Sequence, residues 1–542
     1  MVRLTDDIRT ASQQFAAAGI TVPAYDPAKV SQAAISQPVW LHVGPGNFFR
    51  AMHAVIAQRL LAANLLDAGI VAVDTLGPGV VASVYQPFGN RYLLVVMRAD
   101  GTLDRELVCS VAESHYTPPD DSSTWVRLRQ IAANPALQLV TVTVTEKGYA
   151  QVGSDGQWLP HLLAELTEGP SGARSAVGVI LAVALARFEA GGAPLALVST
   201  DNFSGNGDRL KQSVLRLADE WAARGHVSGE FLAYLRDPAR ISYPLTMVDR
   251  ITPNPAPAVA ERLAAGGFAD TELIQVSPST AMAPFANTEE VWYLVIEDDF
   301  PNGRPAFEQV GVLLADRATV LAADQMKVTT CLNPLHTALA VFGKLLGFES
   351  IAAEMSDPDL LGLVRQIGYV EGLPAVADPK VISPRRFLDE VVERRFPNPN
   401  IPDTPARIAV DTSQKLPIRF GVTIREYLEN PGLDAGKLEF IPLTLAAWGR
   451  YLLGVDDTGA DLDFSPDPLL AEARGRLDGL SPDGGNADVS ALIRLLSDVL
   501  DIDLAQTPLG VKVASYFQQM ATGPGSVRDT LRQSIARFED RL

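Results

Sequence analysis

The stretch "VWLHVGPGNFFRAMH" (39–53) decides the fold of the N-terminal part of the chain. A run of β-forming side chains ends at two glycines, Gly44 and Gly46, and a helical pattern opens near Arg50. Glycines in such a turn let the backbone approach a ligand closely, and a helix N-terminus favours negative charge. The pattern is incomplete, because Phe49 stands where G-x-G-x-x-G has its third glycine. An ordinary strand–helix turn is the alternative, and the neighbouring segments favour a turn that binds a dinucleotide pyrophosphate.

Three more β-rich runs follow the same pattern: "GIVAVD" (69–74), "LQLVTVTV" (137–144) and "LALVST" (195–200). Helical stretches at 50–69 and 207–225 follow some of the strands, and both close on glycine. This alternation predicts a mostly parallel sheet with helices on its faces. "RYLLVVMRADGTLDRELVCSV" (91–111) interrupts it with a hairpin, whose Asp100-Gly101 turn suits type I′.

The sequence pattern changes from mixed strand and helix to helix after about Val320. "HTALAVFGKLLGFESIAAEM", "PRRFLDEVVERRF" and "TLAAWGRYLLGV" are helical, and almost no β-branched alternation remains. A chain of 542 residues also exceeds the roughly 250–300 residues at which single cores stop growing. We therefore expect α/β plus α: a Rossmann-type domain over residues 1–312 and a mainly α-helical domain over residues 313–542.

Composition excludes several classes of protein. The formal net charge of −19 disfavours nucleic acid and anionic membrane, although an anionic small substrate feels only the local field. Two cysteines, Cys109 and Cys331, exclude a disulfide framework and a cysteine-rich zinc site. The N-terminus has no apolar h-region, and "GVILAVALARF" (178–188) is too short for a membrane span. We expect a soluble, cytoplasmic protein in which that segment is a buried helix.

Polar residues follow the predicted strands, where ligands gather in open α/β sheets. Asp74 ends the second strand, where an acid commonly binds the adenosine ribose; a solvated loop acid is equally compatible. Asn202 lies in a Gly- and Ser-rich loop just past its strand. Glu146 and Lys147, in "TVTEKGY" (143–149), flank the nicotinamide or form a surface pair.

The segment "QMKVTTCLNPLHT" (325–337) holds three polar groups among small and apolar side chains. Asn333 and His336 share one helix face, and Pro334 suits the first turn of that helix. Lys327 then precedes the helix on a separate segment that can converge with it, although spacing alone also fits a surface lysine. In "ARIAVDTSQKLPIR" (406–419), the cations can bind a carboxylate or polyol hydroxyls, or form a solvated basic face.

Together these segments resemble the polyol-specific long-chain dehydrogenase family, also called the mannitol dehydrogenase family. The resemblance runs from about Val39 to Arg425. It rests on "GPGNFFRAMH", "TVTEKGY", "STDNFSGNG", "MVDRITP", "IEDDFPNGRP", "KVTTCLNPLHTALA" and "RFPNPNIPDTPARIAVDTSQKLPIR".

The resemblance implies a metal-independent enzyme that uses NAD and places a lysine as general base. Lys327 matches the base, Asn202 and Asn333 match the groups that hold the reacting oxygen, and His336 matches the group that positions a substrate hydroxyl. The substrate-binding residues it implies are Asp249, Arg407 and Lys415. The cofactor-binding residues we assign are Gly44, Gly46, Asn47, Phe48, Arg50, Asp74, Thr145 and Glu146.

Two departures from the family pattern stand out. Five residues separate Lys327 from Asn333, where better-known polyol members have four, and Phe49 replaces a histidine. Chain length and the "KVTTCLNPLHTALA" form favour the branch that interconverts D-mannonate and D-fructuronate (fructuronate reductase). Mannitol 2-dehydrogenase or D-arabinitol dehydrogenase is the alternative, and a catalytically silent NAD-binding sugar-acid sensor or a zinc-dependent polyol dehydrogenase is more distant. Asp74 favours NAD, because a carboxylate there repels a 2′-phosphate.

Overall fold

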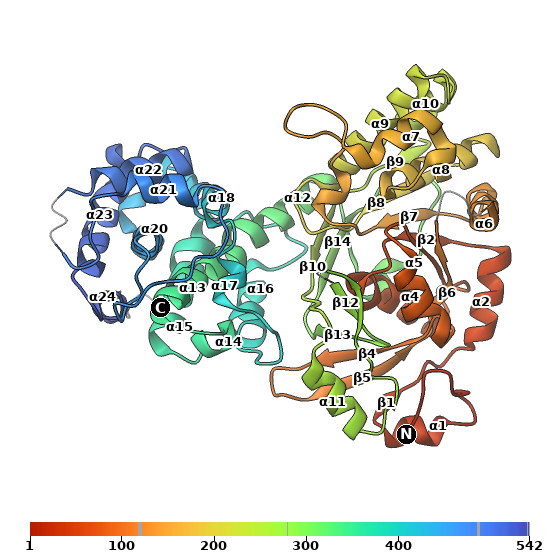
Figure 1. Cartoon of the computed structure of the whole chain (residues 1–542), viewed down its shortest axis with the longest axis horizontal. Coiled ribbons are helices and arrows are strands. Elements are labelled where there is room, and N and C mark those ends of the chain that lie inside the picture. Colours follow the sequence, from red (N-terminus) through yellow and green to blue (C-terminus); the bar gives the residue numbers. More distant parts are fainter. Residues whose placement is uncertain (118–121, 279, 485–487, 539, 541–542) are drawn as a thin grey trace. The chain divides into compact units, whose positions relative to one another are not determined.

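The computed structural model describes residues 1–117, 122–278, 280–484, 488–538 and 540. The chain forms two compact units, one from residues 1–98 and 102–321 and one from residues 99–101 and 322–542 (Figure 1). The division falls inside helix α12 (Arg317–Met326), beyond the boundary expected after residue 312.

A six-stranded, all-parallel sheet forms the centre of the first unit. Its order is β6-β3-β2-β7-β8-β9. The strands are β2 (Trp40–Val43), β3 (Ile70–Asp74), β6 (Val111–Tyr116), β7 (Leu139–Val142), β8 (Leu195–Ser199) and β9 (Ile241–Ser242). The order runs outward in both directions from β2 and β7, so the carboxyl ends of these two strands mark the point where ligands bind in doubly wound sheets. The predicted Rossmann-type sheet is confirmed.

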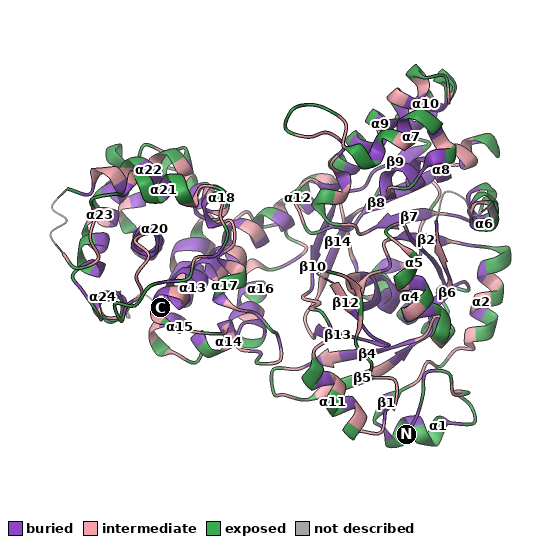
Figure 2. Cartoon of the chain, viewed as in Figure 1, coloured by how far each residue is buried: buried purple, intermediate pink, exposed green. Residues whose placement is uncertain are grey.

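Both faces of this sheet are covered, which explains why its strands lack polar alternation (Figure 2). Leu41 and Val43 point to one face, where they join the core of α8 (Ala176–Glu189) and α9 (Asn206–Ala223). Trp40 points to the opposite face and packs with α4 (His53–Ala62). The side chains of a strand alternate between faces, so one apolar run serves two cores.

Smaller sheets and further helices complete the first unit. The sheets are β1-β5-β4-β13, β10-β14-β15 and β11-β12. Their strands are β1 (Ile20–Thr21), β4 (Tyr92–Met97), β5 (Leu103–Val108), β10 (Thr246–Asp249), β11 (Ile274–Ser277), β12 (Thr280–Met282), β13 (Phe285–Glu289), β14 (Tyr293–Glu297) and β15 (Leu313–Ala315). The remaining helices are α1 (Ser12–Ala17), α2 (Pro27–Ser36), α3 (Asn47–Ala51), α5 (Pro78–Val80), α6 (Ser122–Ala133), α7 (Leu163–Glu168), α10 (Gly229–Arg236) and α11 (Pro257–Ala265).

Two local predictions in this unit are wrong in detail. The helix expected over 50–69 is broken at Met52 into α3 and α4, and it ends at Ala62, followed by the left-handed Asn64. The hairpin of β4 and β5 is confirmed, but its turn is not type I′. Type I′ needs positive φ at both central residues, and of Asp100 and Gly101 only Gly101 has one, at 85°.

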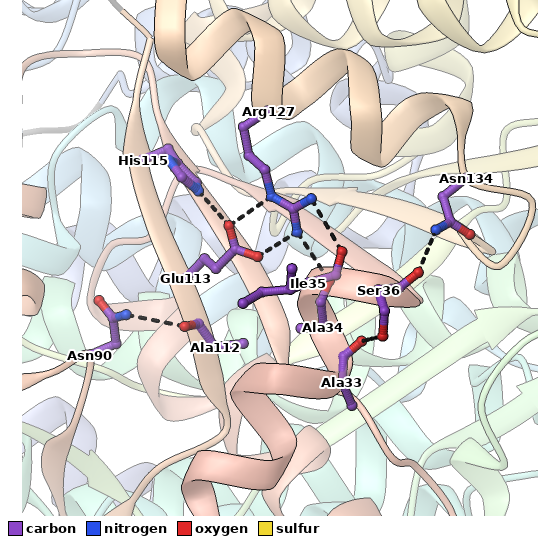
Figure 3. A network of polar contacts seen from close by, with 10 residues as sticks. All are labelled: Ala33, Ala34, Ile35, Ser36, Asn90, Ala112, Glu113, His115, Arg127 and Asn134. Carbon is purple, nitrogen blue, oxygen red and sulfur yellow. Dashed lines mark hydrogen bonds and ion pairs between the residues drawn. The ribbon is translucent and has the colours of Figure 1, made fainter.

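A polar network joins the edge strand β6 to two helices (Figure 3). Arg127 of α6 binds Glu113 of β6 through two hydrogen bonds of 2.9 and 2.5 Å, and it donates to the carbonyls of Ala34 and Ile35 at the end of α2. Burial alone would raise the pKa of Glu113, and hydrogen bonds from His115 and Arg127 lower it instead to about 2. The guanidinium therefore satisfies both the C-terminal carbonyls of a helix and a strand carboxylate.

One helical stretch, residues 160–189, is long and apolar enough to cross a membrane by composition, among the residues that the structure describes. Its most apolar part is α8, which packs inside the first unit against the sheet. The prediction of a buried helix over 178–188 is confirmed.

The second unit is helical, as predicted. Its helices are α13 (Asn333–Leu346), α14 (Ile351–Glu354), α15 (Pro358–Arg365), α16 (Pro384–Glu390), α17 (Pro405–Ile408), α18 (Thr412–Leu416), α19 (Val422–Glu429), α20 (Phe440–Leu452), α21 (Leu470–Arg476), α22 (Ser490–Leu500), α23 (Pro508–Met520) and α24 (Ser526–Phe538). Helix α20 is buried along its whole length and packs against α13 and α23.

Candidate active site

The turn after β2 requires its first glycine. Gly44 has a φ of +94°, and a Cβ atom there would lie 2.1 Å from the carbonyl oxygen of Thr143. Gly46 precedes α3, and a Cβ atom built on it would meet no other atom within 4 Å. The backbone at Gly46 is therefore open to a ligand, whereas Gly44 is required by the close approach of Thr143, the residue that follows β7.

A buried histidine, His42, holds this turn through hydrogen bonds. His42 Nε2 lies 3.2 Å from the Gly44 carbonyl oxygen, and Nδ1 lies 2.7 Å from the Thr141 hydroxyl. Because a carbonyl only accepts, Nε2 carries the proton, and Nδ1 accepts from Thr141. Trp40 Nε1 donates in turn to Thr141 Oγ1 at 2.8 Å. Burial holds the pKa of His42 well below its ordinary value, so the neutral ring is the form that maintains this chain of bonds. Sequence reasoning missed His42.

The three predicted cofactor residues of α3 have different environments. Asn47 Nδ2 donates to the Ala281 carbonyl at 3.0 Å, while its Oδ1 is buried without a hydrogen-bond partner. Phe48 is partly exposed. Arg50 is fully buried, donates to the Ala283 carbonyl at 2.8 Å and lies over the ring of Tyr92. The fold thus brings Asn47 and Phe48 to the glycine turn, and directs Arg50 into the interior, because the helix turns its side chain toward β12 and β13.

Asp74 ends β3 and is buried, not a solvated loop acid. Its Oδ1 accepts from the Leu76 amide at 3.1 Å, and its Oδ2 is enclosed without a hydrogen-bond partner. Burial raises the pKa of Asp74. A buried carboxylate oxygen without a donor is costly, and a ligand hydroxyl would relieve that cost.

A cavity of about 270 Å³ opens at the carboxyl ends of β7 and β8, and we call it the strand-end cavity. Four of the predicted site residues line it together, although they come from three separate segments. Its lining residues are Phe48, Thr143, Thr145, Glu146, Thr200, Asp201, Asn202 and Phe203.

Asp249 lies elsewhere in the first unit, at the end of β10. It is buried and pairs across the ladder with Tyr293 of β14. The next residue, Arg250, points inward and donates to the carbonyls of Ala51 and Glu289. Arg250 therefore joins β10 to the end of α3.

In the second unit, Lys327 is buried, with 2% of its surface exposed, and it opens a π-helical turn over Lys327–Cys331. Its Nζ lies 3.2 Å from the Asp324 carboxylate. A π-helical turn holds one residue more than an α-helical turn, which accounts for the fifth residue between Lys327 and Asn333. The predicted break follows at Leu332, whose φ is −129°.

Asn333 and His336 lie in the first turn of α13. His336 Nε2 is 2.7 Å from Asp403 Oδ2, and its ring centroid is 4.8 Å from that of Phe396. Burial lowers the pKa of His336, the Asp403 carboxylate opposes this, and the nearby arginines add to the lowering. Asp403 was not singled out from the sequence, because its partners lie far from it along the chain.

Three cations gather around this turn, and we call them, with His336 and Asp403, the His336 cluster. Arg407 binds Asp403 at 2.5 Å with 59% of its side chain exposed. Arg419 donates to Thr337 Oγ1 at 2.6 Å and to the Asn333 carbonyl at 3.3 Å, and burial lowers its pKa to about 10. Lys415 donates to the carbonyls of Ile408 and Val410.

Burial, with a smaller effect of Arg419, lowers the pKa of Lys415 to about 8. Two of its three N–H donors are used by carbonyls, which leaves one for a ligand. The cluster therefore gathers three cations around the Asp403 carboxylate, and the charges of Asp411 and Asp467 oppose the lowering of the Lys415 pKa. Such a site suits a small anion.

No group of three or more His, Cys, Asp and Glu side chains that could hold a metal ion is found among the described residues.

Comparison with known proteins accounts for both units. Residues 39–309 match the Mannitol dehydrogenase Rossmann domain, and residues 320–518 match the Mannitol dehydrogenase C-terminal domain. D-mannonate oxidoreductase of Thermotoga maritima is 42% identical over 523 residues, which cover 96% of this chain and 96% of that protein. D-mannonate oxidoreductase of Escherichia coli is 30% identical, over 91% of this chain and 97% of that protein.

A solved structure agrees with these matches. The Pseudomonas fluorescens mannitol 2-dehydrogenase, a ternary complex with NAD and D-mannitol, superposes with a TM-score of 0.67 at 26% identity and covers 97% of each chain. The two matched domains span most of the sequence in order. The predicted resemblance is confirmed: the chain belongs to the mannitol dehydrogenase family of oxidoreductases.

Proposed function

We propose that this protein is an NAD-dependent oxidoreductase that interconverts D-mannonate and D-fructuronate. The observation that carries the proposal is the 42% identity to a D-mannonate oxidoreductase over 96% of both chains. A second D-mannonate oxidoreductase matches at 30% over nearly the same length. Each of these two matches spans both domains of the chain.

Two features of the first unit fit a nicotinamide dinucleotide. The open backbone at Gly46 and the N-terminus of α3 suit a pyrophosphate, with Asn47 and Phe48 beside it. The enclosed Oδ2 of Asp74 suits a ribose hydroxyl, and its charge disfavours a 2′-phosphate, so we infer NAD over NADP. Thr145 and Glu146, in the strand-end cavity, are assigned to the nicotinamide half.

The chemistry removes a proton from oxygen and a hydride from carbon. NAD⁺, when bound, takes up the hydride. Lys327 accepts the hydroxyl proton in oxidation and returns it in reduction, as a general acid and base. Asn202 and Asn333 donate hydrogen bonds to the developing alkoxide, as in an oxyanion hole. His336 positions a neighbouring substrate hydroxyl, and Asp249 accepts from another.

The substrate carboxylate is assigned to the His336 cluster. Arg407 presents a half-exposed guanidinium, and Lys415 keeps one N–H donor for a ligand. Charge-assisted hydrogen bonds to a carboxylate are among the stronger polar contacts. The same cations can also bind the hydroxyls of a hexitol, so the cluster fits a sugar acid and does not separate it from a polyol.

A polyol dehydrogenase is the second candidate, favoured by the likeness to a mannitol 2-dehydrogenase whose structure contains D-mannitol. NADH formation, followed by absorbance, decides between the two when D-mannonate, D-altronate, D-mannitol and D-arabinitol are each offered with NAD⁺ and with NADP⁺. We expect the highest kcat/KM with D-mannonate and NAD⁺, unchanged after a chelator. Turnover of D-mannitol above that of D-mannonate would overturn the substrate, and no turnover with NADH binding intact would favour a silent sensor.

A further inference from the structure

Thr145 has a backbone conformation that threonine rarely adopts. Its φ is +66° and its ψ is 163°, a region that glycine alone enters without steric strain. The residue follows β7 by a short step and lines the strand-end cavity beside Glu146 and Asn202. A β-branched side chain persists there only if its surroundings over-determine the backbone, and such sites cluster at ligand-binding positions.

The carboxylate of Asp201 supplies that constraint. Asp201 Oδ1 accepts from the Thr145 amide at 2.7 Å and from the Val144 amide at 3.0 Å. Its Oδ2 accepts from the Tyr149 hydroxyl at 2.6 Å. Three donors from one short segment thus converge on a single side chain, so the turn between β7 and the following helical turn cannot relax while Asp201 is in place.

Asp201 is itself held in place by contacts of its backbone and by its donor Tyr149. Only 3% of the residue is exposed, and a buried carboxylate is costly unless donors surround it. Its own carbonyl accepts from Asn206 Nδ2 at 2.9 Å, which anchors the loop after β8. Tyr149, one of its donors, is buried and also contacts Ser199 Oγ at 2.8 Å. Burial raises the pKa of Asp201, while these hydrogen bonds oppose the rise.

We propose that Asp201 is a positioning residue that holds the strained Thr145 turn and the Asn202 loop together around the strand-end cavity. The inference rests on the proposed function, because the cavity is assigned there to the nicotinamide half of the cofactor. One carboxylate then sets the distance between two segments that line the cavity. The first follows β7 and holds Thr145 and Glu146, and the second follows β8 and holds Asn202.

Three variants test this role. Asp201→Ala removes the acceptor of all three donors, and we expect the Kd for NADH and the KM for NAD⁺ to rise on the order of tenfold to a hundredfold. Asp201→Asn keeps one oxygen that can accept from the two amides, so the Kd for NADH should stay within about a few-fold of the wild-type value. Asp201→Ala combined with Thr145→Gly should regain most of the lost affinity, since glycine needs no constraint to adopt this φ.

The double variant distinguishes a positioning role from a general loss of stability. If Asp201→Ala acted only by destabilising the fold, Thr145→Gly would not restore NADH binding. Asp208→Ala is the matched control, because Asp208 is an exposed acid in the first turn of α9 whose partner is Arg317. Its NADH binding should equal that of wild type. Unchanged Kd in Asp201→Ala, or no recovery in the double variant, would overturn the proposal. If Asp201→Ala does not fold, Tyr149→Phe, which removes one donor, replaces it, and an unchanged Kd there counts against the proposal equally.

Failure of the proposed function gives a different result. Wild-type protein that binds no NADH contradicts the cofactor assignment itself. Hydrogen exchange then tests the turn without a ligand: the amides of Val144 and Thr145 should exchange faster in Asp201→Ala than in Asp201→Asn. Equal protection of these amides in the two variants would overturn the positioning role.

Discussion

The ammonium of Lys327 lies 3.2 Å from the carboxylate of Asp324, and the two side chains are 3% and 10% exposed. The pair sits where α12 gives way to a π-helical turn, so a local irregularity of the helix places the amine. A lysine that is buried and paired with an acid is not a surface lysine. Burial thus excludes the surface lysine that spacing alone allowed, and the general-base role of Lys327 stays a prediction.

Lys327→Ala should lower kcat for D-mannonate oxidation by about 10²–10⁴-fold, since no other group is assigned to accept the hydroxyl proton. The Kd for NADH should change little, because the residues assigned to the cofactor lie in the first unit. Steady-state kinetics and a fluorescence titration with NADH measure the two quantities. Lys344→Ala, in the last turn of α13 and outside the His336 cluster, is the control. Near-normal turnover in Lys327→Ala would remove the lysine from the mechanism.

Asp74→Asn should raise kcat/KM for NADP⁺ by about tenfold or more relative to NAD⁺, because it removes the charge that repels a 2′-phosphate while keeping a hydrogen-bonding side chain. Burial raises the pKa of Asp74, so in the wild type the preference for NAD⁺ should weaken as pH falls through that raised value. Asp67→Asn, an exposed acid just before β3, is the comparison. An unchanged NADP⁺/NAD⁺ ratio in Asp74→Asn would mean that another residue reads the ribose.

Much of the fold is readable from local sequence, because short apolar runs closed by glycine or a polar residue fix β2, β3, β7 and β8. What the sequence does not reveal depends on contacts between distant residues. The break at Met52 and the inward direction of Arg50 follow from packing against β12 and β13, which no local pattern encodes. The helix was also expected to end at Gly69, because glycine commonly ends helices. It ends earlier, before the left-handed Asn64.

The candidate site divides along the same line. Residues that follow strand ends, such as Asn202 and Thr145, can be singled out from the sequence because the position itself is informative. Residues that act through others were missed: Asp201 and Asp403 organise segments remote in sequence, and each resembles an ordinary loop acid when read alone. A resemblance supplied the role of Lys327, since its spacing from Asn333 makes sense only once the π-helical turn is seen.

Lys415 should give substrate binding a pH dependence. Burial lowers its pKa to about 8, so the side chain is charged below that value and neutral above it. The KM for D-mannonate should therefore rise as pH increases through about 8, whereas the KM for an uncharged polyol should not follow the same step. Lys415→Met should raise the KM for D-mannonate about tenfold at neutral pH and remove this step. Lys415→Arg, which stays charged, should remove the step without the rise; a step that survives in Lys415→Met would belong to another group.

Glu354 should make the second unit less stable as pH rises. Its carboxyl group is fully buried, neither oxygen has a hydrogen-bond partner, and a Cβ atom on Gly343 would lie 1.8 Å from Oε1. Burial, with the charges of Asp403 and Asp357, raises its pKa to about 9 from an ordinary 4.5. Between these values the folded chain keeps a proton that the unfolded chain has lost, so the free energy of unfolding falls by up to about 1.4 kcal/mol per pH unit.

Glu354→Gln keeps the volume and removes the titration. The urea midpoint of the variant should therefore depend less on pH than that of the wild type, and it should exceed the wild-type midpoint at alkaline pH, where the wild type must bury a charge or expose the group. Glu349→Gln, an exposed neighbour, should reproduce the wild-type curve. Parallel curves for Glu354→Gln and wild type would show that the carboxyl group ionises normally in the folded protein, and that a donor not evident in this packing satisfies it.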